Sequence, residues 1–140
     1  MYPPYSYKIK EEEGRELIFD PCRKTWIKLT PEEWVRQNFL QYLLQVMKYP
    51  GSMIAIEKEL KMGELTKRFD MLVYDSNHHP WMMIECKAMG VHLDENVLLQ
   101  ILRYNIAIPV PYIVITNGSY CAAFQKVNGQ LVHLKSLPPI

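Results

Sequence analysis

Residues 67–88 read KRFDMLVYDSNHHPWMMIECKA, and two apolar runs in this stretch flank a short polar segment. The runs at 67–75 and 81–88 have the composition of β-strands. The segment 76–80 between them, Ser-Asn-His-His-Pro, consists of residues that favour turns. The sequence therefore predicts two antiparallel strands joined by a tight turn.

Acidic residues stand inside both predicted strands. Side chains alternate between the two faces of a strand, so Glu85 and Lys87 share a face and Cys86 points the opposite way. Asp70 and Glu85 are roughly equidistant from the turn, so strand pairing can place them side by side. Two adjacent carboxylates repel each other unless a cation joins them. The pattern favours a cation site between the two strands.

Oxygen ligands from Asp70, Glu85 and the Cys86 carbonyl suit Mg²⁺ or Mn²⁺. Such a metal would acidify a bound water and stabilise charge on a phosphate, while Lys87 would orient the nucleophile or neutralise developing charge. This layout is typical of phosphodiester hydrolysis. The alternative from spacing alone is an ion-paired sheet edge in which Asp70 meets Lys87 or Arg68.

The Glu-x-Lys spacing is not specific by itself, since Glu59 and Lys61 repeat it. The copy at Glu85 differs because a predicted strand holding Asp70 precedes it across a short turn. We therefore favour Glu85 and Lys87 over Glu59 and Lys61 as site residues because of their predicted position beside Asp70, and not because of the motif.

A well-marked helix precedes the strands. Residues 30–33, Thr-Pro-Glu-Glu, combine a capping box with proline at the first helical position, which predicts a helix from 31 to about 48. Its apolar stripe comprises Val35, Phe39, Tyr42, Leu43 and Val46. A third strand is expected at 52–61, between this helix and the pair of strands.

The remaining elements follow in short order. A second helix is expected over 94–107, with Asp94 as its cap. Its expected inner residues are Val97, Ile101, Tyr104 and Ile108. The apolar run 112–116 follows a helical crossover, which favours a strand parallel to the one that holds Glu85. A last hairpin, 119–127 with 130–135, turns at Asn128-Gly129.

The N-terminal part is expected to contribute little chemistry. Residues 1–15 are predicted to be a loose leader, partly ordered by packing on the body. Short strands at 17–19 and 26–29 predict a small hairpin. Residues 16–140 are expected to form one domain of the α/β class with a mixed central sheet and added N- and C-terminal hairpins.

Composition narrows the setting and the partners. The 140 residues are 49% hydrophobic, which suffices for one core, and the net charge of +1 means that any DNA contact is local. Three widely spaced cysteines fit neither a disulfide framework nor a zinc site, so a cytoplasmic location is expected. No apolar stretch approaches the length of a membrane span, so no membrane partner is expected.

Three residues of the second predicted helix are candidates to flank the site. Gln100 and Tyr104 are four positions apart and therefore neighbours on one helical face, with Arg103 three positions from Gln100. The alternative is that Tyr104 is a core aromatic residue.

Together these residues resemble the PD-(D/E)xK nucleases, and within them the domain at the N-terminus of type I restriction enzyme R subunits. The resemblance covers roughly residues 17–124. It rests on 31–37 (PEEWVRQ), 68–70 (RFD), 84–87 (IECK), 100–104 (QILRY) and 116–118 (TNG).

The resemblance implies a restriction-endonuclease-like core of a helix, three antiparallel strands, a second helix and a further strand. It also implies that Asp70 and Glu85 bind the metal and that Lys87 is catalytic. The spacing of Gln100 and Tyr104 resembles the QxxxY motif of RecB-type nucleases, where both residues are associated with the active site and DNA.

Family members often add an acidic residue from the first helix, and Glu32 and Glu33 compete for this role. At 100° per residue, Glu32 lies in the sector of Phe39 and Leu43, whereas Glu33 occupies the capping-box position that reaches back to Thr30. Glu32 is therefore favoured at the metal.

The expected function is a Mg²⁺- or Mn²⁺-dependent deoxyribonuclease without its own translocase or nucleotide cofactor, since no Walker A motif is present. Modest phosphate contacts are expected from Arg36, Lys67, Arg68 and Arg103. A homodimer or partner subunit is expected to complete the DNA cleft. The alternative is a catalytically silent module that keeps the nuclease fold to bind DNA or a protein.

Overall fold

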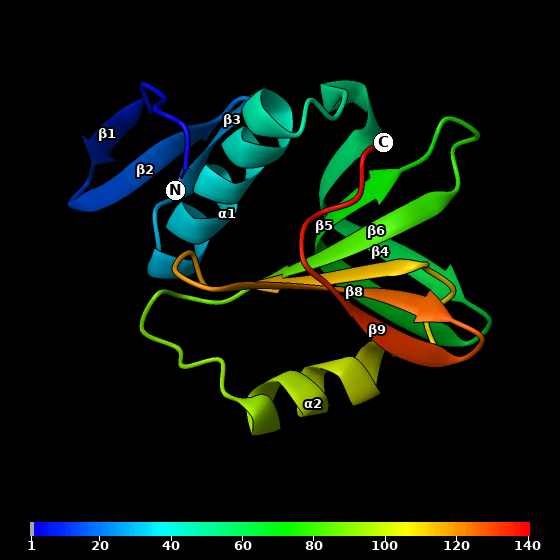
Figure 1. Cartoon of the computed structure of the whole chain (residues 1–140). Helices are drawn as coiled ribbons and strands as arrows, with labels where there is room; N and C mark the ends of the chain where they lie inside the picture. Colours follow the sequence, from blue (N-terminus) through cyan, green and yellow to red (C-terminus); the bar gives the residue numbers. More distant parts are fainter. Residues whose placement is uncertain (1) are drawn as a thin grey trace.

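The computed structural model describes residues 2–140 (Figure 1). The elements are β1 (Ile9–Glu12), β2 (Arg15–Asp20), β3 (Thr25–Lys28), α1 (Pro31–Gln41), the π-helical η1 (Tyr42–Val46), the 3-10 turn η2 (Gly51–Met53), β4 (Ile54–Met62), β5 (Leu65–Tyr74), β6 (Pro80–Cys86), α2 (Glu95–Asn105), β7 (Tyr112–Thr116), β8 (Cys121–Val127) and β9 (Gln130–Leu134). Their order agrees with the order expected for the core.

Helix α1 begins where the sequence predicts. The Glu33 N–H donates to Thr30 Oγ1 at 3.0 Å, and Pro31 occupies the first turn, where a missing N–H costs nothing. Helix α2 is capped in the same way, because the Val97 N–H donates to Asp94 Oδ1 at 2.9 Å. Both helices therefore start at caps that were visible in the sequence.

The central sheet has the strand order β4-β5-β6-β7-β8-β9. Strands β6 and β7 run parallel, with Glu85 opposite Ile115, and the other neighbouring strands are antiparallel. The crossover through α2 explains the single parallel pair, since parallel strands cannot be joined by a tight turn. The predicted mixed α/β fold is confirmed.

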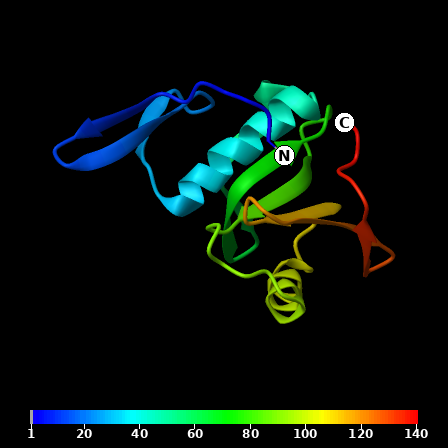
Figure 2. The ribbon, with the colours of Figure 1, turned by 60° about the vertical axis from the view of Figure 1, so that its left-hand side comes forward.

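The two helices cover opposite faces of this sheet (Figures 1 and 2). On the α1 face, Phe39 and Leu43 belong to one buried cluster with Ile84 of β6. On the α2 face, Leu102 belongs to a second cluster with Ile113 of β7. Burial on both sides explains why β6 and β7 read as nearly continuous apolar runs.

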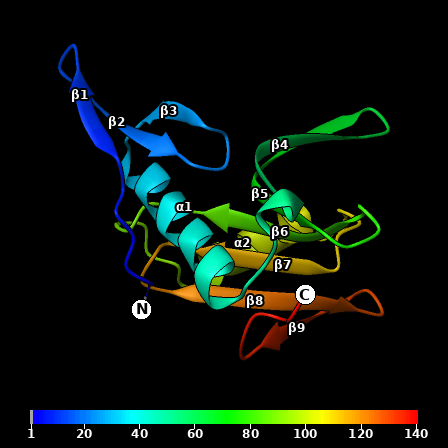
Figure 3. The same ribbon diagram turned by 90° about the horizontal axis from the view of Figure 1, so that it is seen from above.

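The N-terminal segment differs from the expected loose leader. Ile9–Glu12 forms β1, which pairs with β2 and places Ile9 opposite the buried Ile18. The ring of Tyr2 packs edge-on against Phe39 and Tyr42. The sequence did not predict this strand, because residues 10–13 are all charged. The strand forms because β2 provides a pairing partner in the folded protein. The result is a separate three-stranded sheet, β1-β2-β3, which projects from the body (Figure 3).

No helix within residues 2–140 is long and apolar enough to cross a membrane.

Leu43→Ala should lower the free energy of unfolding by about 2–5 kcal/mol, because it leaves a cavity in the core. Leu43 is fully buried, whereas Val46 in the same helical segment is half exposed. Val46→Ala is the matched control and should change stability by no more than about 0.5 kcal/mol. Urea unfolding measures both variants, and equal losses would contradict the assignment of the buried face.

Candidate active site

The strands β5 and β6 stop pairing at the predicted site. Their ladder ends with Met71 opposite Ile84, and beyond this pair the Asp70 side chain reaches across to β6. Asp70 Oδ2 accepts the Cys86 N–H at 2.8 Å. The expected pairing of the two strands is therefore present, and it places Asp70 against the Glu85-Cys86 peptide.

The other neighbour of β5 is also irregular at this point. Ile56 pairs with Met71 and Lys58 pairs with Phe69, but Glu57 and Asp70 between them do not pair. Glu57 has φ of 50°, in the left-handed region that is uncommon for residues with a side chain. Local distortion of this kind re-aims side chains and concentrates at functional sites. Asp70 thus lies at a break in both of its ladders.

Glu85 and Lys87 lie beside Asp70 at the end of β6. Lys87 Nζ is 3.8 Å from Glu85 Oε1, and both side chains are partly exposed, at 35% and 28%. Lys87 follows the last residue of β6, but its main-chain N–H donates to the Thr116 carbonyl at 2.8 Å. The carboxylate and the ammonium group therefore extend from main chain that is fixed by the sheet, and both remain accessible to solvent.

Cys86 points to the opposite face, as the alternation predicts. Its side chain is buried in the α1-side cluster, and burial raises the pKa of the thiol well above its usual range. A thiolate ligand is excluded by this environment. The main-chain carbonyl is the remaining group of Cys86 that suits a hard cation.

The structure separates the two acidic candidates of α1. Partial burial raises the pKa of Glu32, and the Asp70 carboxylate raises it further, whereas Arg36 and Lys87 lower it. Glu32 is therefore within the electrostatic reach of the site. The Glu33 side chain instead turns inward, where its Oε2 accepts Gln37 Nε2 at 2.9 Å rather than reaching back to Thr30. Because Glu33 is buried and bonded to Gln37, Glu32 remains the candidate ligand of α1.

The three acidic candidates come from three different elements: Glu32 of α1, Asp70 of β5 and Glu85 of β6. Their oxygen chemistry fits Mg²⁺ or Mn²⁺. Within residues 2–140, no three His, Cys, Asp or Glu side chains are already close enough to form a cation site. Glu32 and Glu85 are accessible enough to rotate toward a cation, while Asp70 is fixed by its bond to Cys86.

One predicted DNA contact is corrected. Arg36 is buried, and its Nη1 donates to Glu57 Oε1 at 2.6 Å while Nη2 lies 3.4 Å from Glu33 Oε1. Its charge is compensated inside the protein and is not presented to DNA. Arg68 is 63% exposed but also pairs with Glu57, at 2.7 Å, and Arg103 is exposed.

The QxxxY residues lie on the solvent side of α2. Tyr104 is 70% exposed, so it is not the inner residue that was expected, and Gln100 is exposed as well. The buried side of α2 includes Leu102 and Asn105, which face the sheet, whereas Gln100 and Tyr104 do not. Lys67 Nζ lies 3.4 Å from the centre of the Tyr104 ring. Within residues 2–140, neither Gln100 nor Tyr104 forms a hydrogen bond with the candidate catalytic residues.

Glu57 is the site residue that sequence reasoning missed. It connects Arg36, Arg68 and Arg23, and Arg23 in turn binds the buried Asp20 at 2.6 Å. This network ties β2, α1, β4 and β5 together around Asp70. No sequence pattern predicts a glutamate with a left-handed backbone conformation inside a strand. The one available signal was Arg36, because an arginine on an apolar helix face requires a buried acidic partner.

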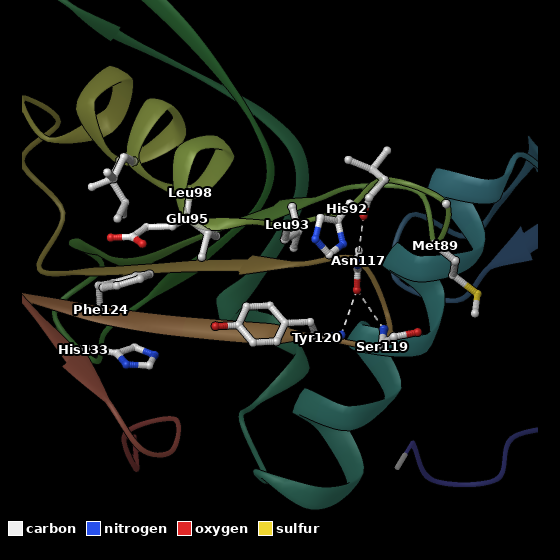
Figure 4. A pocket seen from close by; sticks show the side chains of 14 residues that line it. Met89, His92, Leu93, Glu95, Leu98, Asn117, Ser119, Tyr120, Phe124 and His133 are labelled. Carbon is white, nitrogen blue, oxygen red and sulfur yellow. Dashed lines mark hydrogen bonds between the residues drawn. The ribbon is translucent and has the colours of Figure 1, made fainter.

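A cavity of about 830 Å³ lies between the N-terminal part of α2, the loop 89–93 and strand β8 (Figure 4). Its lining is mainly apolar and aromatic and includes none of the candidate catalytic residues. Asn117 lies at the border of this cavity and connects two loops. Its Nδ2 donates to the Val91 carbonyl at 2.8 Å, in the loop that follows Lys87. Its Oδ1 accepts the N–H groups of Ser119 and Tyr120. The cavity is separate from the acidic site.

The six-stranded mixed sheet between two helices, with acids and a lysine where β5 and β6 separate, defines a restriction-endonuclease-like domain of nuclease-related character. A family model described as type I restriction enzyme R protein N terminus matches residues 31–138. The chain therefore belongs to this family, as the resemblance indicated. No curated protein matches the chain.

Glu57→Gln should make stability less sensitive to acid. The hydrogen bond from Arg36 lowers the pKa of the Glu57 carboxyl below its ordinary value of 4.5. A lowered carboxyl pKa gives stability that is present above 4.5 and is lost as the pH falls through the folded-state value. The melting temperature of the wild type should therefore exceed that of the variant at pH 7, and the gap should close toward pH 3.

Glu64→Gln, in the exposed turn between β4 and β5, removes the same charge away from the network and is the control. A gap between wild type and Glu57→Gln that stays constant from pH 7 to pH 3 would contradict the assigned role of the ionised carboxylate.

Proposed function

We propose that this domain is a Mg²⁺- or Mn²⁺-dependent nuclease that hydrolyses phosphodiester bonds of DNA, with Asp70, Glu85 and Lys87 as its catalytic residues. The observation that carries the proposal is the hydrogen bond from the Cys86 N–H to Asp70 at the point where β5 and β6 separate. This bond holds an aspartate beside a Glu-x-Lys segment, which distinguishes the arrangement from a chance pair of charged strands.

The residues that would hold the cation are Asp70, Glu85 and Glu32, with the carbonyl of Cys86. A bound Mg²⁺ or Mn²⁺ would acidify a water molecule and neutralise charge on the phosphate. Asp70 needs little rearrangement for this task because one of its oxygens is already fixed by the peptide of Cys86. Fixed ligands reduce the entropy that is lost on binding.

Lys87 is proposed to supply a positive charge that stabilises the negative charge developing on the phosphate. Its ammonium group lies 3.8 Å from Glu85 in the free protein and is accessible, so it can turn to a phosphate oxygen or to the attacking water. A preorganised cation aimed at developing negative charge is worth several kcal/mol in an active site. The hydrogen bond from the Lys87 main-chain N–H to the Thr116 carbonyl limits the range of positions that the ammonium group can reach.

The DNA is proposed to lie across the exposed edge near Lys67, Arg68 and Arg103, with Gln100 and Tyr104 on the neighbouring face of α2. Each of these side chains is at least partly accessible. A second copy or a partner subunit is proposed to complete the cleft. The proposed setting is the cytoplasm.

One observation favours a second candidate, a DNA-binding module without catalysis. The acidic side chains are not already gathered into a cation site within residues 2–140. In that case the same surface would bind DNA and leave it intact in the presence of Mg²⁺ and Mn²⁺. The two candidates are therefore separated by one assay.

Purified protein should cut supercoiled plasmid DNA when Mg²⁺ or Mn²⁺ is added. Lys87→Ala and Asp70→Asn should each lower the rate by about 100-fold or more, because each removes a charge that acts on the reacting phosphate or its metal. Lys135→Ala, which removes an exposed lysine after β9, is the control and should keep the wild-type rate.

Gel electrophoresis over time measures the rates, and melting temperatures establish that the variants are folded. Cleavage by Lys87→Ala at the wild-type rate would refute the assignment. A wild-type protein that retards the DNA in a gel without cutting it, with either metal, would favour the binding module.

A further inference from the structure

Charged side chains are sorted by face on the N-terminal sheet. Lys10 of β1 is opposite Leu17 of β2, which is opposite Lys28 of β3. Lys8 accepts the Phe19 N–H with its carbonyl, and Phe19 is opposite Trp26. Residues directly opposite each other share a face. One face, called here the lysine face, therefore carries Lys8, Lys10, Glu12, Arg15, Leu17, Phe19, Trp26 and Lys28.

The reverse face has the opposite character. It carries Ile9, Glu11, Glu16, Ile18, Asp20, Thr25 and Ile27. Asp20 of this face is buried and bonded to Arg23, while Glu11 is opposite Glu16. The lysine face, in contrast, has four basic residues and one acidic residue. The near-neutral composition of the chain conceals this segregation, because the two sets of charges cancel in the sum.

The cations of the lysine face are available to a ligand. Lys10 Nζ lies 4.3 Å from the centre of the Trp26 ring and Lys8 Nζ lies 5.6 Å from the centre of the Phe19 ring, so aromatic rings support both ammonium groups. Lys10 also pairs with Glu12 at 3.2 Å, but both are exposed and such pairs are weak. In the described part of the chain, Lys8 and Lys28 form no ion pair, and both are exposed.

The spacing of these cations fits an extended polyanion. Residues two apart along a strand, such as Lys8 and Lys10, are about 7 Å apart, and Lys10 and Lys28 are separated by two strand spacings, about 10 Å. One small anion cannot contact charges so widely spread. A nucleic-acid backbone presents regularly spaced phosphates over this distance, and the exposed edge of Trp26 offers an apolar surface beside them.

The sheet is joined directly to the candidate active site. β3 leads into α1, and Lys28 is only four residues before Glu32, so their Cα atoms are at most about 14 Å apart. The views of the ribbon show the sheet on the α1 side of the molecule (Figures 1 and 3). The family match begins at residue 31 and therefore does not cover this sheet.

We infer that the lysine face is a second DNA-binding surface, which contacts the phosphate backbone of duplex DNA beside the segment held at Asp70 and Glu85. The position of the scissile phosphate rests on the proposed function, but the binding surface does not. The sheet would lengthen the bound segment and raise affinity without adding sequence specificity, since phosphate contacts carry no sequence information.

The test compares Lys8→Gln/Lys28→Gln with the wild type for binding to a fluorescent duplex of about 30 base pairs in EDTA, which prevents cleavage. Each lost phosphate contact should reduce the slope of log affinity against log salt by about 0.9, so the double variant should lose about 2 in slope between about 50 and 200 mM salt. Its affinity at about 100 mM salt should fall by roughly tenfold or more.

Lys48→Gln/Lys135→Gln removes the same charge from two exposed positions far from β1-β2-β3 in the chain and is the matched control. It should keep the wild-type slope, and melting temperatures should show that both double variants are folded. Equal slopes for the two double variants would overturn the inference. So would binding of the wild type to anionic phosphatidylserine vesicles without measurable binding to the duplex.

The outcome is independent of catalysis. A loss of slope in Lys8→Gln/Lys28→Gln together with no plasmid cleavage by the wild type would retain the binding surface and reject the nuclease. Cleavage by the wild type with unchanged slopes would retain the nuclease and reject the surface.

Discussion

The hydrogen bond from the Cys86 N–H to Asp70 is the interaction on which the site depends. At this point β5 has left the ladder with β6, so the Cys86 N–H would otherwise lack an acceptor from β5. A buried peptide donor without a partner is costly, and the aspartate removes this cost while its second oxygen stays available. Asp70 therefore completes the hydrogen bonding of the sheet at the candidate site.

The distortion at Glu57, where the ladder between β4 and β5 is interrupted, is accompanied by buried charge pairs. Glu57 adopts a left-handed conformation and binds Arg36, which also meets Glu33. Burying a guanidinium group is unfavourable unless carboxylates compensate it, so each partner requires the others. The same arginine lowers the pKa of Glu32, whereas burial and the Asp70 carboxylate raise it. The ion pairs of Arg36 therefore affect both the stability of the protein and the electrostatic environment of the candidate site. A substitution in this network should change both properties.

Local patterns in the sequence predicted the elements that are decided locally. The caps at Thr30 and Asp94, the turn before Pro80 and the alternation that separates Glu85 from Cys86 depend on neighbouring residues only, and the structure has all of them. Tyr104, Arg36 and Ile9 were misplaced because their positions depend on distant partners: the sheet under α2, the carboxylate of Glu57 and the strand that receives β1. The metal roles of Asp70, Glu85 and Glu32 remain predictions.

Titration with Mn²⁺, followed by electron paramagnetic resonance, tests most directly whether Glu32, Asp70 and Glu85 form a divalent-cation site. We expect saturable binding of Mn²⁺ by the wild type, weaker binding by Glu32→Gln, loss of binding by Asp70→Asn and unchanged binding by Glu64→Gln. Saturable binding of equal strength in the wild type and Asp70→Asn, or no binding by the folded wild type, would contradict this site.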